Sequence, residues 1–109
     1  MTLPMDLPPH DAARRIADGS AFLLDVREPD EFALAHVAEA VLIPLGEITA
    51  RVAEIPDDRD VIVMCRSGRR SGEAQRSLME RGYRRIANLD GGIIAWEKAG
   101  LPIRSGDGR

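Results

Sequence analysis

Short apolar runs alternate with helical patterns along the chain, and turn-forming residues separate them. The apolar runs predict buried strands, and stretches whose apolar residues recur about every 3.6 residues predict helices. Glycine and proline mark the boundaries, as at Gly19 behind the first helical stretch and Pro56 behind the third. The predicted strands are 21–26, 41–43, 60–64 and 85–89, and the predicted helices are 10–18, 31–36, 46–54, 72–81 and 93–99.

Strands that are apolar on both sides and separated by helices are typical of a parallel sheet. We therefore expect the α/β class, with a central parallel sheet of four to five short strands and helices on both faces. A length of 109 residues fits one domain over 1–109. Its packed core should cover about 9–103, and the polar residues 104–109 should form a frayed tail. Ligands of such sheets bind beyond the carboxyl ends of the strands.

Charge and composition exclude several classes of protein. The net charge of -3 argues against nucleic-acid binding, which usually needs a basic stripe. No apolar run approaches the roughly 20 residues of a membrane helix, and the first residues lack the features of a signal peptide. One cysteine forms no internal disulfide, so we expect a cytoplasmic protein. Cys65, His10 and His36 do not make a ligand set, so we expect no metal and no cofactor.

Cys65, the single cysteine, directly follows the predicted strand 60–64 and opens a polar turn that leads into a helical pattern. Such a turn directs backbone N–H groups inward, and the helix start, which we expect Ser71 to cap, adds partial positive charge. This setting favours a thiolate, which makes Cys65 the predicted nucleophile, with a buried structural thiol as the alternative. Lowering the pKa from about 8.5 by ~2 units requires about 2.7 kcal/mol, which these donors can supply without a histidine base.

Three arginines crowd this turn within an acidic chain, which predicts capture of a small anion. Arg70 stands at the predicted helix start, where its charge opposes the helix dipole unless an anion or a carboxylate offsets it. Gly68 lets the backbone turn without a side chain that would obstruct the pocket. The predicted anion-binding loop comprises Arg66, Ser67, Gly68, Arg69, Arg70 and Ser71.

Asp25 and Arg27 end another strand at the same expected edge of the sheet. We expect both to support the site structurally, as a carboxylate and a guanidinium that fix neighbouring loops by hydrogen bonds. A further hypothesis is that Asp25 orients the Cys65 loop. We expect His36 to be a hydrogen-bonded structural residue and Trp96 to lie in the core.

Four motifs follow one another along about 13–103. They are Asp25-Val26-Arg27 with Glu31-Phe32, His36-Val37 with Ile43-Pro44, Cys65-Arg66-Ser67-Gly68-Arg69-Arg70-Ser71, and Leu89-Asp90-Gly91-Gly92 with Trp96. Together they resemble the rhodanese-like (sulfurtransferase) family. The chain departs from the family pattern around His36. The family usually has Gly before this histidine, where the chain has Ala35, and Pro-Gly after the next apolar residue, where the chain has Ala38 and Glu39. That departure leaves the local backbone geometry open.

The resemblance implies a sulfurtransferase in which Cys65 takes sulfur from a small anionic donor such as thiosulfate and becomes a persulfide. The acceptor would be a thiol, cyanide or the cysteine of a partner protein. An alternative is a partner-binding or sulfur-delivery module with little small-molecule turnover. A phosphatase or arsenate reductase is disfavoured, because loops of those enzymes carry five residues between the cysteine and the arginine. Here four residues separate Cys65 from Arg70.

Overall fold

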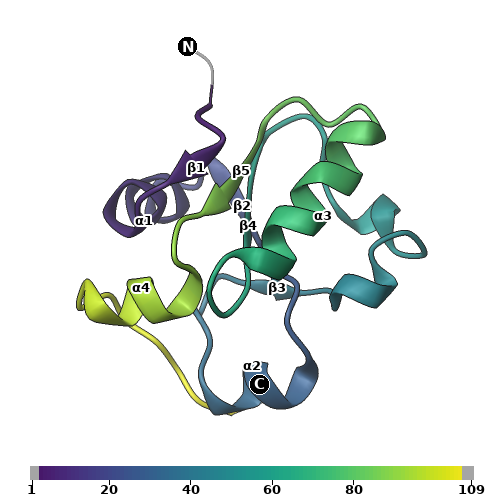
Figure 1. Ribbon diagram of the computed structural model, residues 1–109. Coiled ribbons are helices and arrows are strands. Elements are labelled where there is room, and N and C mark those ends of the chain that lie inside the picture. Colours follow the sequence, from purple (N-terminus) through teal and green to yellow (C-terminus); the bar gives the residue numbers. More distant parts are fainter. Residues whose placement is uncertain (1–2, 107–109) are drawn as a thin grey trace.

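A five-stranded parallel sheet forms the centre of the molecule in the computed structural model, which describes residues 3–106 (Figure 1). The order of strands across the sheet is β1-β5-β4-β2-β3, and all neighbours are parallel. The predicted α/β class with a parallel sheet is confirmed. The strands are β1 (Asp6–Leu7), β2 (Ala21–Asp25), β3 (Val41–Leu42), β4 (Asp60–Met64) and β5 (Ile86–Leu89).

Helices cover both faces of this sheet, as predicted. On one face, α1 (Pro9–Ala17) and α4 (Gly92–Lys98) pack against the sheet. On the other face lies α3 (Arg69–Glu80) together with two short 3₁₀ turns. Side chains of β4 alternate between the two apolar clusters, so Met64 faces α1 and α4, whereas Val63 and Cys65 face α3. The alternation therefore places the cysteine sulfur beneath the start of α3.

The helix α2 (Pro29–Leu34) follows the carboxyl end of β2 and lies outside the two helical layers. Pro29 occupies its first turn, where the missing N–H of proline costs nothing. Phe32 is the buried residue that holds the helix against the domain. This position brings α2 beside the loop that follows β4.

The strand β1 is absent from the prediction. It pairs in parallel with β5, and the buried side chain of Leu7 joins the α1–α4 face. Two residues are too few to give a periodic pattern, so the sequence carries no local signal for it. The packed core therefore begins before residue 9.

The predicted helix over 46–54 is wrong. Two separate 3₁₀ turns, η1 (Leu45–Glu47) and η2 (Val52–Glu54), occupy this stretch. The N–H of Ile48 donates to the carbonyl of Leu45, three residues back, as in a 3₁₀ turn. Gly46 and Thr49 are poor helix formers, which favours the shorter turns over a regular α-helix.

The start of the predicted helix 72–81 and the predicted frayed tail also differ from the structure. The helix α3 begins at Arg69 instead of residue 72, with Gly68 at the N-cap position, so Ser71 lies inside the first turn and does not cap. The chain near residue 104 is held and not frayed, because Arg104 exchanges two backbone hydrogen bonds with His36. The expected tail also includes 107–109, which lie outside the described residues.

We predict that Leu7→Ala lowers the free energy of unfolding by about 2–4 kcal/mol, because it removes a side chain that is 2% exposed in the core. Urea unfolding measures the change. Leu34→Ala is the control, since Leu34 is 80% exposed, and it should change stability by no more than about 0.5 kcal/mol. Equal effects of the two substitutions would show that β1 does not anchor the sheet.

Candidate active site

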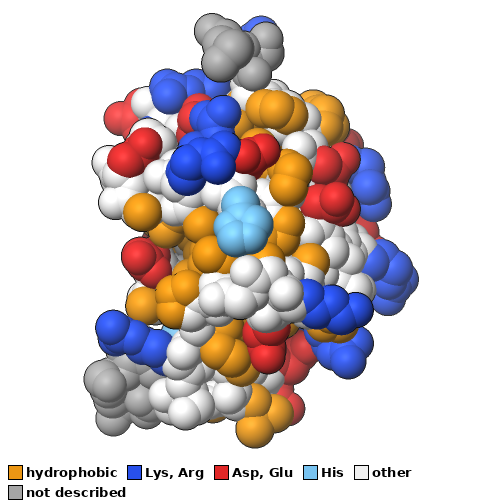
Figure 2. All heavy atoms as spheres, turned by 90° about the vertical axis from the view of Figure 1, so that its left-hand side faces the viewer, with side chains coloured by type: hydrophobic (Ala, Val, Ile, Leu, Met, Phe, Trp, Pro, Cys, Tyr) orange, Lys and Arg blue, Asp and Glu red, His pale blue; other side chains and the backbone are white. Residues whose placement is uncertain are grey.

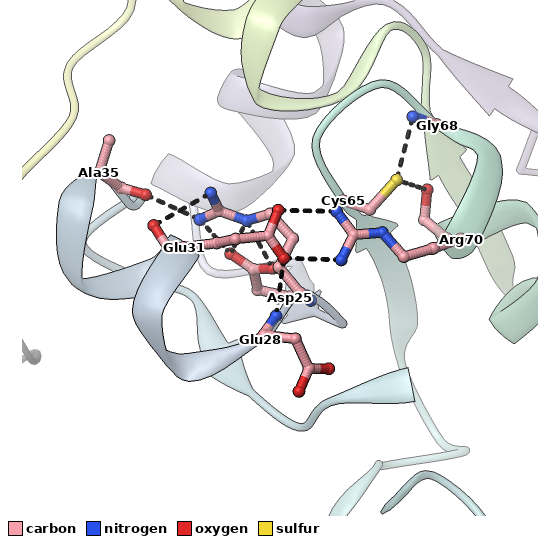
Figure 3. Close-up of polar contacts among 9 residues, drawn as sticks. Asp25, Glu28, Glu31, Ala35, Cys65, Gly68 and Arg70 are labelled. Carbon is pink, nitrogen blue, oxygen red and sulfur yellow. Dashed lines mark hydrogen bonds and ion pairs between the residues drawn. The ribbon is translucent and has the colours of Figure 1, made fainter. Parts of the chain in front are cut away.

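The sulfur of Cys65 lies at the carboxyl end of β4, inside the loop that leads into α3. The side chain is buried, and its Sγ accepts a hydrogen bond from the N–H of Gly68 at 3.0 Å. The Ser71 hydroxyl lies 3.3 Å from the same sulfur. The sulfur therefore has polar partners although almost no solvent reaches it (Figure 3).

These contacts determine the charge that the sulfur can hold. Burial raises the pKa of the Cys65 thiol, because it disfavours the charged form. The Ser71 hydroxyl and the backbone N–H groups of Ser71, Gly68 and Ser67 act in the opposite direction and outweigh burial. The net result is a pKa below the ordinary value, without a histidine base, and this agrees with the expectation from the sequence.

The first turn of α4 holds the other side of the loop. The N–H of Ile93 donates to the carbonyl of Cys65 at 3.0 Å, and the N–H of Ile94 donates to the carbonyl of Arg66 at 3.2 Å. This approach requires glycine at residue 92, which has φ +61°. A Cβ there would lie 2.4 Å from the Arg66 carbonyl oxygen. In the sequence, the only signal for this close backbone contact is the glycine pair Gly91-Gly92, which the sequence analysis names only as part of a motif.

The three arginines of the loop have different surroundings. Arg70 forms a two-pronged ion pair with Glu31 of α2, at 2.7 and 2.8 Å (Figure 3). Arg69 is exposed and extends towards Glu73, with 4.0 Å between the charged atoms. Arg66 is exposed and lines a pocket of about 240 Å³ between α2 and α4. Carboxylates therefore offset the charges of Arg66 and Arg69 less than the charge of Arg70.

Glu31 is a residue of the site region that sequence reasoning missed. It supplies the carboxylate that the position of Arg70 at a helix start required. The Arg70 guanidinium lowers the pKa of Glu31 to about 2, against a smaller opposing effect of burial. The signal in the sequence was its place in the Glu31-Phe32 motif, at the acidic first turn of α2.

Asp25 and Arg27 form a buried ion pair at the carboxyl end of β2, with 2.8 Å between their charged atoms. Arg27 also donates to the carbonyl of Ala35 at 2.7 Å, which ties the end of α2 to the sheet. Ala35 therefore keeps an ordered backbone where the family usually has glycine. The carboxylate of Asp25 bonds to Arg27, and within the described residues no hydrogen bond joins it to the 65–71 loop. The polar contacts of this carboxylate lead to the loop through Arg27 and α2, whose Glu31 pairs with Arg70.

His36 and Trp96 have the structural surroundings that we expected. The Nδ1 of His36 lies 2.9 Å from the carbonyl oxygen of Phe32, and the two rings stack with centroids 4.0 Å apart. The indole N–H of Trp96 donates to the carbonyl of Pro102, and the ring is buried.

The surface carries mixed charge. Figure 2 shows the side of the molecule with α1 and α4, where acidic and basic side chains are interspersed. Over residues 3–106, no three side chains of His, Cys, Asp or Glu are grouped so that they could hold a metal ion. No helix within the same range has the length and the apolar character to cross a membrane.

The fold and the loop define a class of α/β protein that holds one buried cysteine sulfur among backbone amides, between a parallel strand and a helix. The model of the rhodanese-like domain family matches residues 8–99. This chain belongs to that family.

Three known proteins illustrate the relationship. The chain is 47% identical over 97 residues to a sulfurtransferase of Allochromatium vinosum, covering 88% of this chain and 91% of that one. It is 38% identical over 80 residues to the putative sulfur carrier protein YrkF of Bacillus subtilis, covering 73% of this chain and 43% of that one. The crystal structure of a thiosulfate sulfurtransferase from Pseudomonas aeruginosa gives a TM-score of 0.85 at 29% identity, covering 99% of this chain and 21% of that one. These relatives support sulfur transfer as the general activity.

We predict that Gly92→Ala raises the midpoint of Cys65 alkylation by about one pH unit, which slows the reaction about tenfold at a pH well below the midpoint, because the new Cβ pushes the Arg66 carbonyl away and turns the loop. The rate of reaction with iodoacetamide measures this. Gly19→Ala is the matched control, since Gly19 also has a positive φ (+79°) but nothing within 4 Å of an added Cβ. The control should lose stability without slower alkylation. Equal alkylation rates in both variants would contradict the role of the α4 contact.

We predict that Glu31→Gln lowers the free energy of unfolding by about 1–2 kcal/mol at pH 7, an amount reduced by the partial exposure of the ion pair. A carboxyl whose pKa falls to about 2 on folding stabilises the fold above its ordinary pKa of 4.5. That contribution disappears as the pH falls through about 2. Urea unfolding of both proteins between pH 7 and pH 2 should therefore show a shrinking difference. Glu54→Gln, which removes a carboxylate from an exposed ion pair, is the control. If the stability difference between the wild type and Glu31→Gln did not depend on pH, the lowered pKa of Glu31 would be contradicted.

Proposed function

We propose that this protein is a sulfurtransferase that carries sulfur on Cys65 as a persulfide. The observation that supports this most directly is the position of the sulfur, which is buried, hydrogen-bonded by Gly68 and placed at the carboxyl end of a central parallel strand. The same donors that favour a thiolate would also favour the negatively charged persulfide. Thiosulfate is the proposed donor, in keeping with the name of the structural relative from Pseudomonas aeruginosa.

Each step balances without an external oxidant or reductant. The Cys65 thiolate attacks the outer sulfur of thiosulfate, the sulfur–sulfur bond of the donor breaks, and sulfite leaves with the bonding electron pair. Cys65 then carries a persulfide anion. A nucleophile such as cyanide or a thiolate attacks the terminal sulfur, and the Cys65 thiolate leaves. The products of that second step are thiocyanate or a new persulfide.

The exposed arginines of the loop would guide a doubly charged donor to this site. Arg66 and Arg69 supply positive charge around the buried sulfur. Arg70 is held by Glu31, so its proposed contribution is to the position of the loop more than to direct donor binding. Ser67 and Ser71 would contribute N–H groups to the bound sulfur.

The second candidate is a delivery module that passes sulfur to a partner protein and turns over small molecules slowly. The relative named a putative sulfur carrier favours it. So does Leu34, an exposed apolar side chain at the rim of the pocket that Arg66 lines. The two candidates share the persulfide on Cys65 and differ in the acceptor, so a fast transfer to protein thiols with slow thiocyanate formation would favour delivery.

We further propose that residues 1–109 act as one domain, because both apolar clusters pack on the same sheet. A reducing compartment such as the cytoplasm would suit a single thiol that must stay free.

We predict that incubation with thiosulfate adds the mass of one sulfur atom to the protein, and that cyanide then removes it as thiocyanate. Mass spectrometry and a thiocyanate assay measure the two steps. Cys65→Ser should abolish both, because Cys65 is the only cysteine in the chain. Turnover that persists in Cys65→Ser would contradict the proposal. Hydrolysis of an aryl phosphate that depends on Cys65 would instead favour the phosphatase alternative.

A further inference from the structure

Asn88 carries a buried amide on β5, between β1 and β4 in the sheet. The mechanism above does not use this side chain. It lies in β5, a strand whose four residues are all buried, and asparagine is disfavoured in strands. Alternation along β5 directs it to the face that carries α3, since its neighbour Leu89 belongs to the opposite cluster. A buried amide in such a place needs hydrogen-bond partners.

Both partners of the Asn88 amide belong to the Cys65 loop. Its Nδ2 donates to the carbonyl of Gly68 at 3.0 Å, and its Oδ1 accepts from the Ser71 hydroxyl at 2.6 Å. Gly68 and Ser71 are the two residues whose N–H and hydroxyl lie against the sulfur, at 3.0 and 3.3 Å. Asn88 therefore holds Gly68 and Ser71, the two residues whose N–H and hydroxyl contact the sulfur. Asn88 itself does not contact the sulfur.

The Ser71 hydroxyl has one proton and two neighbours that compete for it. The orientation of the amide is fixed, because its NH₂ group faces the Gly68 carbonyl, so an oxygen faces Ser71. While the hydroxyl donates to Oδ1, its oxygen is free to accept the S–H of a neutral Cys65 thiol. When the sulfur is negative, the hydroxyl stabilises it only by turning its proton to the sulfur.

We propose that Asn88 is a positioning residue of the Cys65 site: it anchors Gly68 and aligns the Ser71 hydroxyl, which donates to Asn88 beside a thiol and to sulfur beside an anion. The thiolate part of this inference is independent of the proposed function. The part that concerns the persulfide rests on it.

The test is the pH dependence of alkylation of Cys65 by iodoacetamide, which needs no sulfur donor and reports on one thiol only. Asn88→Leu keeps the size of the side chain and removes both hydrogen bonds. We expect the midpoint of the pH–rate profile to rise by about one unit, a tenfold loss of thiolate well below the midpoint. Asn88→Asp is the second variant, in case the first does not fold. It keeps an acceptor for Ser71 but loses the donor to Gly68 and adds negative charge, so it should raise the midpoint as well.

Gln75→Leu is the matched control. Gln75 is another buried amide, on α3, and its NH₂ group donates to the backbone carbonyls of Met5 and Ile86 and not to the loop. It should lower the melting temperature without moving the alkylation midpoint. A merely structural role for Asn88 would give the same result as this control, and an unchanged midpoint in a folded Asn88 variant overturns the proposal.

A double-mutant cycle with Ser71→Ala tests the route of the effect. In the wild type, Asn88→Leu also frees the Ser71 hydroxyl to donate to the sulfur, which offsets part of the rise caused by losing the Gly68 anchor. The midpoint should therefore shift more in the Ser71→Ala background than in the wild type. Equal shifts in the two backgrounds would overturn the competition between Asn88 and the sulfur for the Ser71 proton. A shifted midpoint together with no sulfur adduct from thiosulfate would reject the proposed function and leave the positioning role intact.

Discussion

The hydrogen bonds from the first turn of α4 to the carbonyls of Cys65 and Arg66 are the constraint on which the site depends. The carbonyl and the N–H of one planar peptide point in opposite directions. Holding the Arg66 carbonyl against α4 therefore turns the N–H of Ser67 to the other side, where the sulfur lies. Gly92 makes the approach possible, because any side chain at that position would collide with the loop. A site for an anion thus arises mainly from backbone geometry, and the hydrogen bonds to the sulfur come from the Gly68 N–H and the Ser71 hydroxyl.

A second set of contacts keeps this loop in place from the side of α2. The buried pair of Asp25 and Arg27 anchors the carboxyl end of α2 to the sheet, and Glu31 connects α2 to Arg70 at the start of α3 (Figure 3). Glu31 also offsets a positive charge that would oppose the dipole of α3. The loop is therefore supported on the α4, α2 and β5 sides.

The sequence predicted those features that depend on local patterns. The parallel sheet follows from apolar runs such as 60–64, and the importance of Cys65 follows from its place after that run. The patterns did not reveal β1, because a two-residue strand has no period, and they overestimated the helix at 46–54. They also assigned Ser71 to capping, whereas its hydroxyl lies between the sulfur and Asn88.

Contacts between distant segments account for the other omissions. Glu31 and Asn88 are separated from the residues they hold by 39 and 17–20 positions in the chain, and only the folded sheet brings them together. Gly92 was visible as part of a glycine pair, but its contact with residue 66 was not. The sequence therefore predicted Cys65 as the nucleophile, and the structure was needed to identify the residues that hold its loop.

The most direct measurement is an ultraviolet titration of the thiolate absorbance of the wild-type protein, folded and in concentrated urea. The account predicts that the Cys65 midpoint in the folded state lies below the ordinary value of about 8.5 and returns to it on unfolding. A folded midpoint equal to or above the unfolded one would contradict it, because burial would then outweigh the amide and hydroxyl donors around the sulfur.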